Sequence, residues 1–206
     1  MQMTKEDFDR LWSEFAPAQV PEELWWLCER LNELQPSRCL EIGSGSSGIY
    51  WGFFAPTISL TMAQYSQSDI PHTPQEFAGF ERITHPASEG STSSYLEDYG
   101  VTTYIGDSHK QSTLDQLTAL GPYDFLFIDG DHSRIGVEQD IRMYVPLVNP
   151  GGLVAFHDWD HTGTYPPDSQ FYTTKEACRN TGLFINEIKV VRPPGGMGIA
   201  VHRVPE

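Results

Sequence analysis

The stretch RCLEIGSGSSGIYWGFFA, residues 38–55, combines the features of a strand, a tight turn and a helix. An apolar run that includes Leu40 and Ile42 stops at Gly43, and the segment from Gly43 to Gly48 leads into a second apolar run. Glycine lets a backbone turn tightly and lets it approach a bound ligand closely. We therefore predict a strand, a glycine turn and a helix in this order.

Comparable units follow along the chain. Apolar runs predict further strands at 57–62, 101–107, 125–128, 153–158, 185–191 and 198–204. Helical spacing of apolar residues predicts helices at 21–34, 114–120, 137–148 and 175–181, the third ending at NPGG. Strands that alternate with helices and are almost continuously apolar indicate an α/β fold with a mainly parallel sheet covered on both faces.

A single domain spanning 1–206 is expected, because one domain usually takes about 150 residues and the chain has 206. Within it we predict an N-terminal helical segment at 1–36, whose aromatic residues make it a candidate interface for a homo-oligomer. Residues 63–100 are rich in Ser, Pro, Gly and Thr without sustained periodicity, which predicts an insertion or lid.

Composition argues against several classes of partner. The formal charge of −15 disfavours nucleic acid and anionic membrane surfaces, because both are bound mainly through Lys and Arg. The opening residues lack the pattern of a signal peptide, and no apolar run approaches the length of a membrane span, so we expect a soluble, cytoplasmic protein. The three cysteines show no metal or disulfide spacing and are expected to be reduced.

Polar side chains follow several of the predicted strands. Asp107, Asp129, His132, His157 and Asp158 all stand at or just beyond a strand end. In open parallel sheets, ligands bind beyond the carboxyl ends of the strands. We therefore expect these residues to share one rim with the glycine turn and to form a site there.

With EIGSGSSG, FIDGDHS, PLVNPGGLVAFHD and GGMGIAVHR in place, the sequence resembles the class I S-adenosylmethionine-dependent methyltransferases. It is similar to a bacterial branch with cephalosporin-hydroxylase-like and macrolide sugar O-methyltransferases. The resemblance implies a Rossmann-like, doubly wound, mainly parallel seven-stranded sheet with an antiparallel C-terminal strand. It also implies a set of residues that bind S-adenosylmethionine: Glu41, Gly43, Ser44, Gly45, Gly48, Gln64, Asp107, Ser108 and Asp129.

One position departs from the family pattern. The family usually has an acidic residue at the end of the second strand, which holds the ribose hydroxyls, and here the corresponding residue is the neutral Gln64. Either the strand ends elsewhere, or the carboxylate comes from the insertion, or the nucleoside is bound weakly.

The resemblance also implies a divalent metal site with Asp129, His157 and Asp158 as ligands. Oxygen ligands suit Mg²⁺ and Mn²⁺, and an imidazole shifts the preference toward Mn²⁺. The alternatives are that His157 is not a ligand and that both aspartates cap helices or bond loop amides. His132 lies three residues after Asp129, at the spacing of the family's general base, and a neighbour such as Asp131 could orient it.

These features together predict an enzyme, a metal-dependent O-methyltransferase that acts on a hydroxyl group of a small molecule. Two alternatives stay open: a nucleoside-binding protein of the same fold without catalysis, and a nicotinamide-dependent oxidoreductase. The oxidoreductase would also need an acidic ribose ligand after the second strand, and it would give Glu41 no role.

Overall fold

The computed structural model describes every residue except 18, 44–45, 62–80, 83–95, 161–173 and 192–196. The predicted insertion or lid at 63–100 therefore lies largely outside the described residues, as does Gln64. Within the described part, no helix has the length and apolar character needed to cross a membrane.

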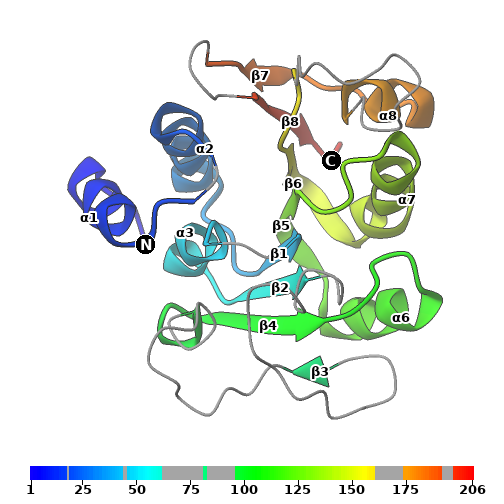
Figure 1. Cartoon of the computed structure of the whole chain (residues 1–206), viewed down its shortest axis with the longest axis horizontal. Helices are drawn as coiled ribbons and strands as arrows, with labels where there is room; N and C mark the ends of the chain where they lie inside the picture. The colour runs from blue at the N-terminus through cyan, green and yellow to red at the C-terminus, as the bar shows by residue number, and fades with distance from the viewer. Residues whose placement is uncertain (18, 44–45, 62–80, 83–95, 161–173, 192–196) are drawn as a thin grey trace.

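The centre of the molecule is one sheet with strand order β3-β4-β2-β1-β5-β6-β8-β7 (Figure 1). Its strands are β1 (Cys39–Ile42), β2 (Thr57–Thr61), β3 (Glu81–Arg82), β4 (Val101–Ile105), β5 (Tyr123–Ile128), β6 (Val148–Phe156), β7 (Glu187–Lys189) and β8 (Ile199–Arg203). Strands β4, β2, β1, β5 and β6 run parallel, and β8 is antiparallel to both of its neighbours. The predicted fold class is confirmed, and the two-residue β3 adds an antiparallel edge strand.

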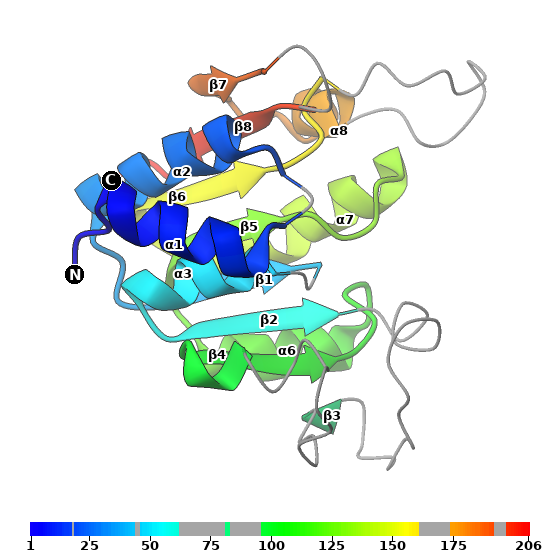
Figure 2. The same ribbon diagram turned by 60° about the vertical axis from the view of Figure 1, so that its left-hand side comes forward.

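Helices cover both faces of the sheet (Figures 1 and 2). The covering on one face consists of α1 (Lys5–Phe15), α2 (Pro21–Leu34) and α3 (Gly48–Phe54). On the other face lie α6 (Gln111–Leu120), α7 (Arg134–Tyr144) and α8 (Thr174–Thr181). Because successive strand residues point to opposite faces, Phe125 and Phe127 pack with Trp51 of α3, whereas Leu126 and Ile128 join the opposite core.

The sequence NPGG does not end a helix. Helix α7 stops at Tyr144, a short 3-10 helix covers Val145–Leu147, and NPGG lies inside strand β6. The pairing of β5 with β6 shifts register between Tyr123 and Phe125, which are paired with Val148 and Leu153. The four residues are thus an irregularity within the strand, which apolar spacing alone does not distinguish from a helix end.

Gly43 marks the end of β1 and is in close contact with the end of β5. Its φ angle is +98°, and a Cβ atom added there would lie 1.9 Å from the carbonyl oxygen of Asp129. The Gly43 amide donates to the carbonyl of Leu60, and the Asp129 amide donates to the carbonyl of Ile42, so both backbones are fixed. Only glycine fits this approach.

We expect Gly43→Ala to destabilise the protein by more than about 3 kcal/mol, because backbone strain and a backbone clash add together. Gly151→Ala is the matched control: its φ is +78°, but no atom lies within 4 Å of an added Cβ. The control should cost about 1–2 kcal/mol, the price of left-handed backbone alone. Urea unfolding of both variants measures the difference, and equal losses would contradict the importance of the contact.

Candidate functional site

The glycine turn is held from behind by Glu41 of β1. This carboxylate is fully buried, and it accepts hydrogen bonds from Ser47 Oγ at 2.5 Å, from Trp51 Nε1 at 3.2 Å and from Ser59 Oγ. A Cβ atom added at Gly48 would lie 2.9 Å from Glu41 Oε2. In this structure Glu41 therefore fixes the start of α3, while Ser44 and Gly45 lie outside the described residues.

Burial has a large effect on the ionisation of Glu41. It raises the pKa of the carboxyl group to about 7, although the hydrogen bonds from Ser47, Ser59 and Trp51 oppose the shift. A buried carboxylate lacks the stabilisation of water, and three donors replace that stabilisation only in part. Glu41 is therefore close to the middle of its titration at neutral pH.

The predicted adenine contacts, Asp107 and Ser108, follow β4 in a loop that packs on α7. Asp107 Oδ1 accepts a hydrogen bond from the amide of His109 at 3.0 Å, and the carbonyl of the buried Ser108 accepts one from Tyr144. His109 Nε2 lies 3.3 Å from Oδ1 of the fully buried Asp140. The sequence did not suggest this pair, because its members come from a loop and from a helix interior.

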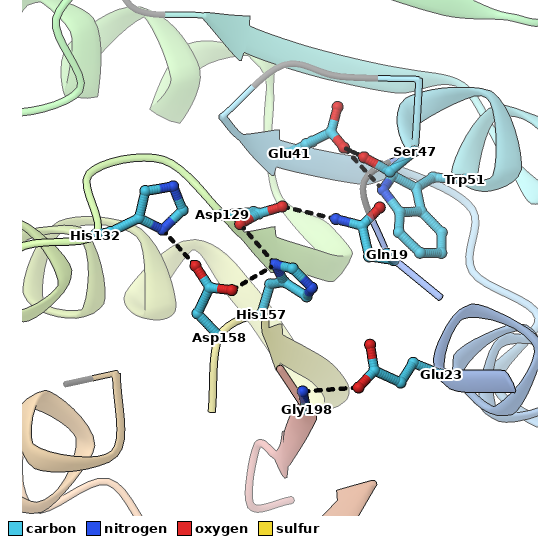
Figure 3. Close-up of polar contacts among 10 residues, drawn as sticks. All are labelled: Gln19, Glu23, Glu41, Ser47, Trp51, Asp129, His132, His157, Asp158 and Gly198. Atoms are coloured by element: carbon cyan, nitrogen blue, oxygen red, sulfur yellow. Dashed lines mark hydrogen bonds and ion pairs between the residues drawn. The ribbon is translucent and has the colours of Figure 1, made fainter. Parts of the chain in front are cut away.

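Four of the predicted residues come together beyond the ends of β5 and β6 (Figure 3). His157 Nδ1 lies 3.1 Å from Asp129 Oδ1 and 3.1 Å from Asp158 Oδ1. His132 Nδ1 lies 2.7 Å from the other oxygen of Asp158. Two carboxylates and two imidazoles thus alternate along the rim. Asp158, and not Asp131, orients His132, because Asp131 Oδ1 accepts from the amide of Ser133.

The two histidines differ in exposure and in ionisation. Burial alone would lower the pKa of His157, but Asp129 and Asp158 outweigh it and raise the pKa to about 9. His157 is therefore protonated at pH 7 and compensates the charge of two carboxylates. The hydrogen bond with Asp158 raises the pKa of His132, whose side chain is 42% exposed against 6% for His157. His132 is thus the imidazole that a ligand can reach.

The cluster also has the donors of a divalent cation site. One atom each from Asp129, His132 and Asp158 lies within 4.8 Å of the others. Carboxylate oxygens with one imidazole suit Mg²⁺ or Mn²⁺, so the residues present fit such an ion. His132 belongs to this set, and the expected ligand His157 lies beside it, with Nδ1 3.1 Å from both carboxylates.

The N-terminal helical segment supplies two buried polar groups that the sequence analysis missed. Gln19, 4% exposed, donates from Nε2 to Asp129 Oδ2 at 2.8 Å. Glu23 of α2 is fully buried, and its Oε1 accepts from the amide of Gly198 at 2.7 Å. One signal existed for Glu23: it stands four residues before Leu27, which places it on the apolar stripe of the helix.

Comparison with known proteins identifies the type of domain. A family model described as a methyltransferase domain matches residues 40–159, which is more than half of the chain. No curated protein sequence matches. Gln19 and Glu23 lie outside the matched range.

Several solved structures share the fold at low sequence identity. TomG from Streptomyces achromogenes, an O-methyltransferase of tomaymycin synthesis in complex with SAM, has a TM-score of 0.61 and 16% identity, covering 98% of this chain and 89% of its own. An O-methyltransferase from Bacillus cereus in complex with SAH has a TM-score of 0.57 and 14% identity, covering 98% and 92%. At these identities the likeness establishes the fold.

MycE, a methyltransferase of the mycinamycin biosynthetic pathway in complex with Mg, SAH and mycinamycin VI, has a TM-score of 0.56 and 16% identity. The alignment covers 97% of this chain and 53% of MycE, so the chain spans about half the length of that relative.

Replacement of Glu41 by Gln should change how stability depends on pH. The pKa of Glu41 is about 7 in the folded chain and 4.5 as a free group, so folding favours the protonated form. Its contribution is fully present below pH 4.5 and is lost as pH rises through 7. The free energy of unfolding should therefore fall less steeply between pH 5 and about 7.5 in Glu41→Gln than in the wild type.

Denaturant unfolding at several pH values in this range measures that difference. Comparing the two proteins cancels the contribution of His157, whose raised pKa acts in the same direction. Parallel stability curves for wild type and variant would show that Glu41 does not titrate in this range.

Proposed function

The chain belongs to the methyltransferase domain family, and from this premise we propose that it is a class I S-adenosylmethionine-dependent methyltransferase that methylates a hydroxyl oxygen of a small molecule. The observation that carries the proposal is the pairing of His132 with Asp158 on the rim of the sheet. An oxygen acceptor must lose a proton when it is methylated, and the site contains an exposed, oriented imidazole that can take it.

We propose His132 as the general base. Its Nδ1–H donates to Asp158 Oδ2, so Nε2 carries the lone pair that accepts the hydroxyl proton. S-adenosylmethionine supplies a methyl group that its positive sulfur already activates. The acceptor oxygen forms a bond to the methyl carbon, the carbon–sulfur bond breaks with its electron pair going to sulfur, and the proton goes to His132. Asp158 then faces an imidazolium, which its carboxylate stabilises.

Asp129 and Asp158 are proposed to hold a divalent cation, with water and the acceptor oxygen as further ligands. Such an ion lowers the pKa of a hydroxyl group that it binds. His157 Nδ1 faces both carboxylates and orients them. Its expected role as a ligand stays a proposal, because ligand atoms about 3 Å apart can bind the same ion. His132 as a third ligand is the competing assignment, since its nitrogen lies in the cluster.

The glycine turn at Gly43 and Gly48 is proposed to receive the methionine and ribose parts of the cofactor, with Asp107 and Ser108 beside the adenine. Glu41 would support the turn from inside the protein, because its three hydrogen bonds leave it no exposed oxygen. For the acceptor, the net charge of −15 disfavours polyanions, and we propose a small hydroxyl compound such as a sugar or a secondary metabolite.

His132→Ala should lower turnover by about 10²- to 10⁴-fold, the usual contribution of a general base. The acceptor for this assay is found first, by screening small phenols and sugars for transfer of a radioactive methyl group. Affinity for S-adenosylhomocysteine and for Mn²⁺, both measured by calorimetry, should stay within about twofold of wild type. A large loss of Mn²⁺ affinity would make His132 a ligand instead of the base.

Asp131→Asn is the matched control for this experiment. The amide oxygen can still accept from Ser133, and Asp131 does not orient His132, so turnover should be retained. Unchanged turnover in His132→Ala would remove it from the mechanism. A wild-type protein that binds S-adenosylhomocysteine but methylates no acceptor in the screen would favour the non-catalytic alternative.

Removal of divalent ions by a chelator should abolish methyl transfer, and added Mg²⁺ or Mn²⁺ should restore it. Asp129→Asn should weaken Mn²⁺ binding by tenfold or more, since it removes a charged ligand oxygen, whereas Asp131→Asn should bind Mn²⁺ as the wild type does. Calorimetric titration of the two variants measures this. Transfer that is indifferent to chelator would leave Asp129 and Asp158 with a purely structural role.

A further inference from the structure

Gln19 carries a buried polar atom that no described residue satisfies. Its Nε2 donates to Asp129 Oδ2 at 2.8 Å, but its carbonyl oxygen Oε1 has no hydrogen-bond partner among the described residues. The side chain is 4% exposed. A buried amide oxygen without a donor is costly, and such atoms in folded proteins usually face a water, an ion or a ligand.

The orientation of this carboxamide is determined by its neighbour. If nitrogen and oxygen were exchanged, the oxygen would face the carboxylate of Asp129 and repel it. The nitrogen therefore points to Asp129, and Oε1 points away from it, so that its hydrogen-bond donor has to be another group. Figure 3 shows Gln19 on the side of Asp129 toward Ser47 and Trp51, whereas His132 and Asp158 lie on the other side.

The position of Gln19 indicates which class of ligand could donate a hydrogen bond to its carbonyl oxygen. Asp129 touches Gly43 through its backbone, and Gly43 is the first glycine of the cofactor turn. The two oxygens of Asp129 face different neighbours: Oδ1 faces His157 and the proposed cation site, and Oδ2 faces Gln19. A carboxylate and an amide oxygen on the turn side together call for a hydrogen-bond donor with positive charge. The amino-acid end of S-adenosylmethionine carries such a group, its α-ammonium.

We propose that Gln19 binds the methyl donor, with its carboxamide oxygen accepting a hydrogen bond from the α-ammonium group of the cofactor. This inference rests on the proposed function. It makes the N-terminal segment, which lies outside the family match, a part of the cofactor site. Glu23 holds this segment in place, because its bond to Gly198 joins α2 to the backbone that also accepts from the amide of Trp159.

Two variants separate contact with the ligand from orientation of Asp129. In Gln19→Met, the new side chain has a shape similar to that of glutamine, but it has no amide nitrogen to donate and no oxygen to accept a hydrogen bond. Gln19→Glu also lacks the N–H that Asp129 receives, but it keeps an oxygen that can accept from an ammonium. Gln139→Met is the control, since Gln139 is exposed on α7.

The probes are S-adenosylhomocysteine and 5′-methylthioadenosine, which is the same nucleoside without the amino-acid end. Calorimetry on the full chain should show that Gln19→Met binds S-adenosylhomocysteine at least tenfold more weakly, the effect of one hydrogen bond to a charged group. Its affinity for 5′-methylthioadenosine should change by less than about twofold. Gln19→Glu should keep the ratio of the two affinities within about threefold of wild type, and the control should match wild type for both probes.

Melting temperatures without ligand show whether each variant is folded. Should Gln19→Met fail to fold, Gln19→Glu decides, because a tenfold fall in its affinity ratio overturns the contact. Equal binding of S-adenosylhomocysteine by Gln19→Met and wild type overturns the inference and leaves the proposed function intact. If both Gln19 variants bind S-adenosylhomocysteine equally weakly, the loss comes from a changed orientation of Asp129, and this result also overturns the inference. A wild-type protein that binds no S-adenosylhomocysteine overturns the proposed function and this inference together.

Discussion

The contact between Gly43 and the backbone of Asp129 is the constraint on which the site depends. An added Cβ would come within 1.9 Å of the Asp129 carbonyl oxygen, so the ends of β1 and β5 approach as closely as they do only because residue 43 is glycine. Because of this close approach, Asp129 contacts residues of both proposed sites. Gln19 and Ser47, which precedes helix α3, lie on one side of Asp129, and His132 with Asp158 lies on the other. The proposed methyl donor and acceptor sites therefore adjoin through a single residue.

The second level of organisation comes from the N-terminal helices. Glu23 of α2 bonds the amide of Gly198, and Gly198 in turn accepts from Trp159, which directly follows Asp158. Gln19 reaches Asp129 itself. The segment before residue 40 is thus bonded directly to Asp129 and, through Gly198, to the residue that follows Asp158. Buried polar contacts of this kind specify one arrangement, because a shifted helix would leave several groups without partners.

The sequence predicts well which residues gather at the edge of the sheet, because their positions follow from the order and direction of the strands. Parallel strands place their carboxyl ends on one edge, so Asp129, His132, His157 and Asp158 could be grouped from their positions after two apolar runs, and the structure brings them together. Their roles remain proposals. Contacts such as Gln19 with Asp129 or His109 with Asp140 follow from the packing of helices against the sheet, which no local pattern records. Spacing likewise suggested Asp131 as the partner of His132, whereas the fold brings Asp158 closer.

Backbone geometry supports a functional reading of Asp158. Among the described residues, Asp158 and Gln35 are the non-glycine residues with positive φ, at 54° and 50°. Gln35 ends helix α2, where this conformation is common, but Asp158 directly follows a strand. Its left-handed backbone carries the carboxylate to both His132 and His157. Such strain persists where the surroundings enforce it, most often at functional sites. Here the attraction between the protonated His157 and the carboxylates of Asp129 and Asp158 favours the left-handed backbone of Asp158. If Asp158 turned away, the imidazolium would keep only one carboxylate partner.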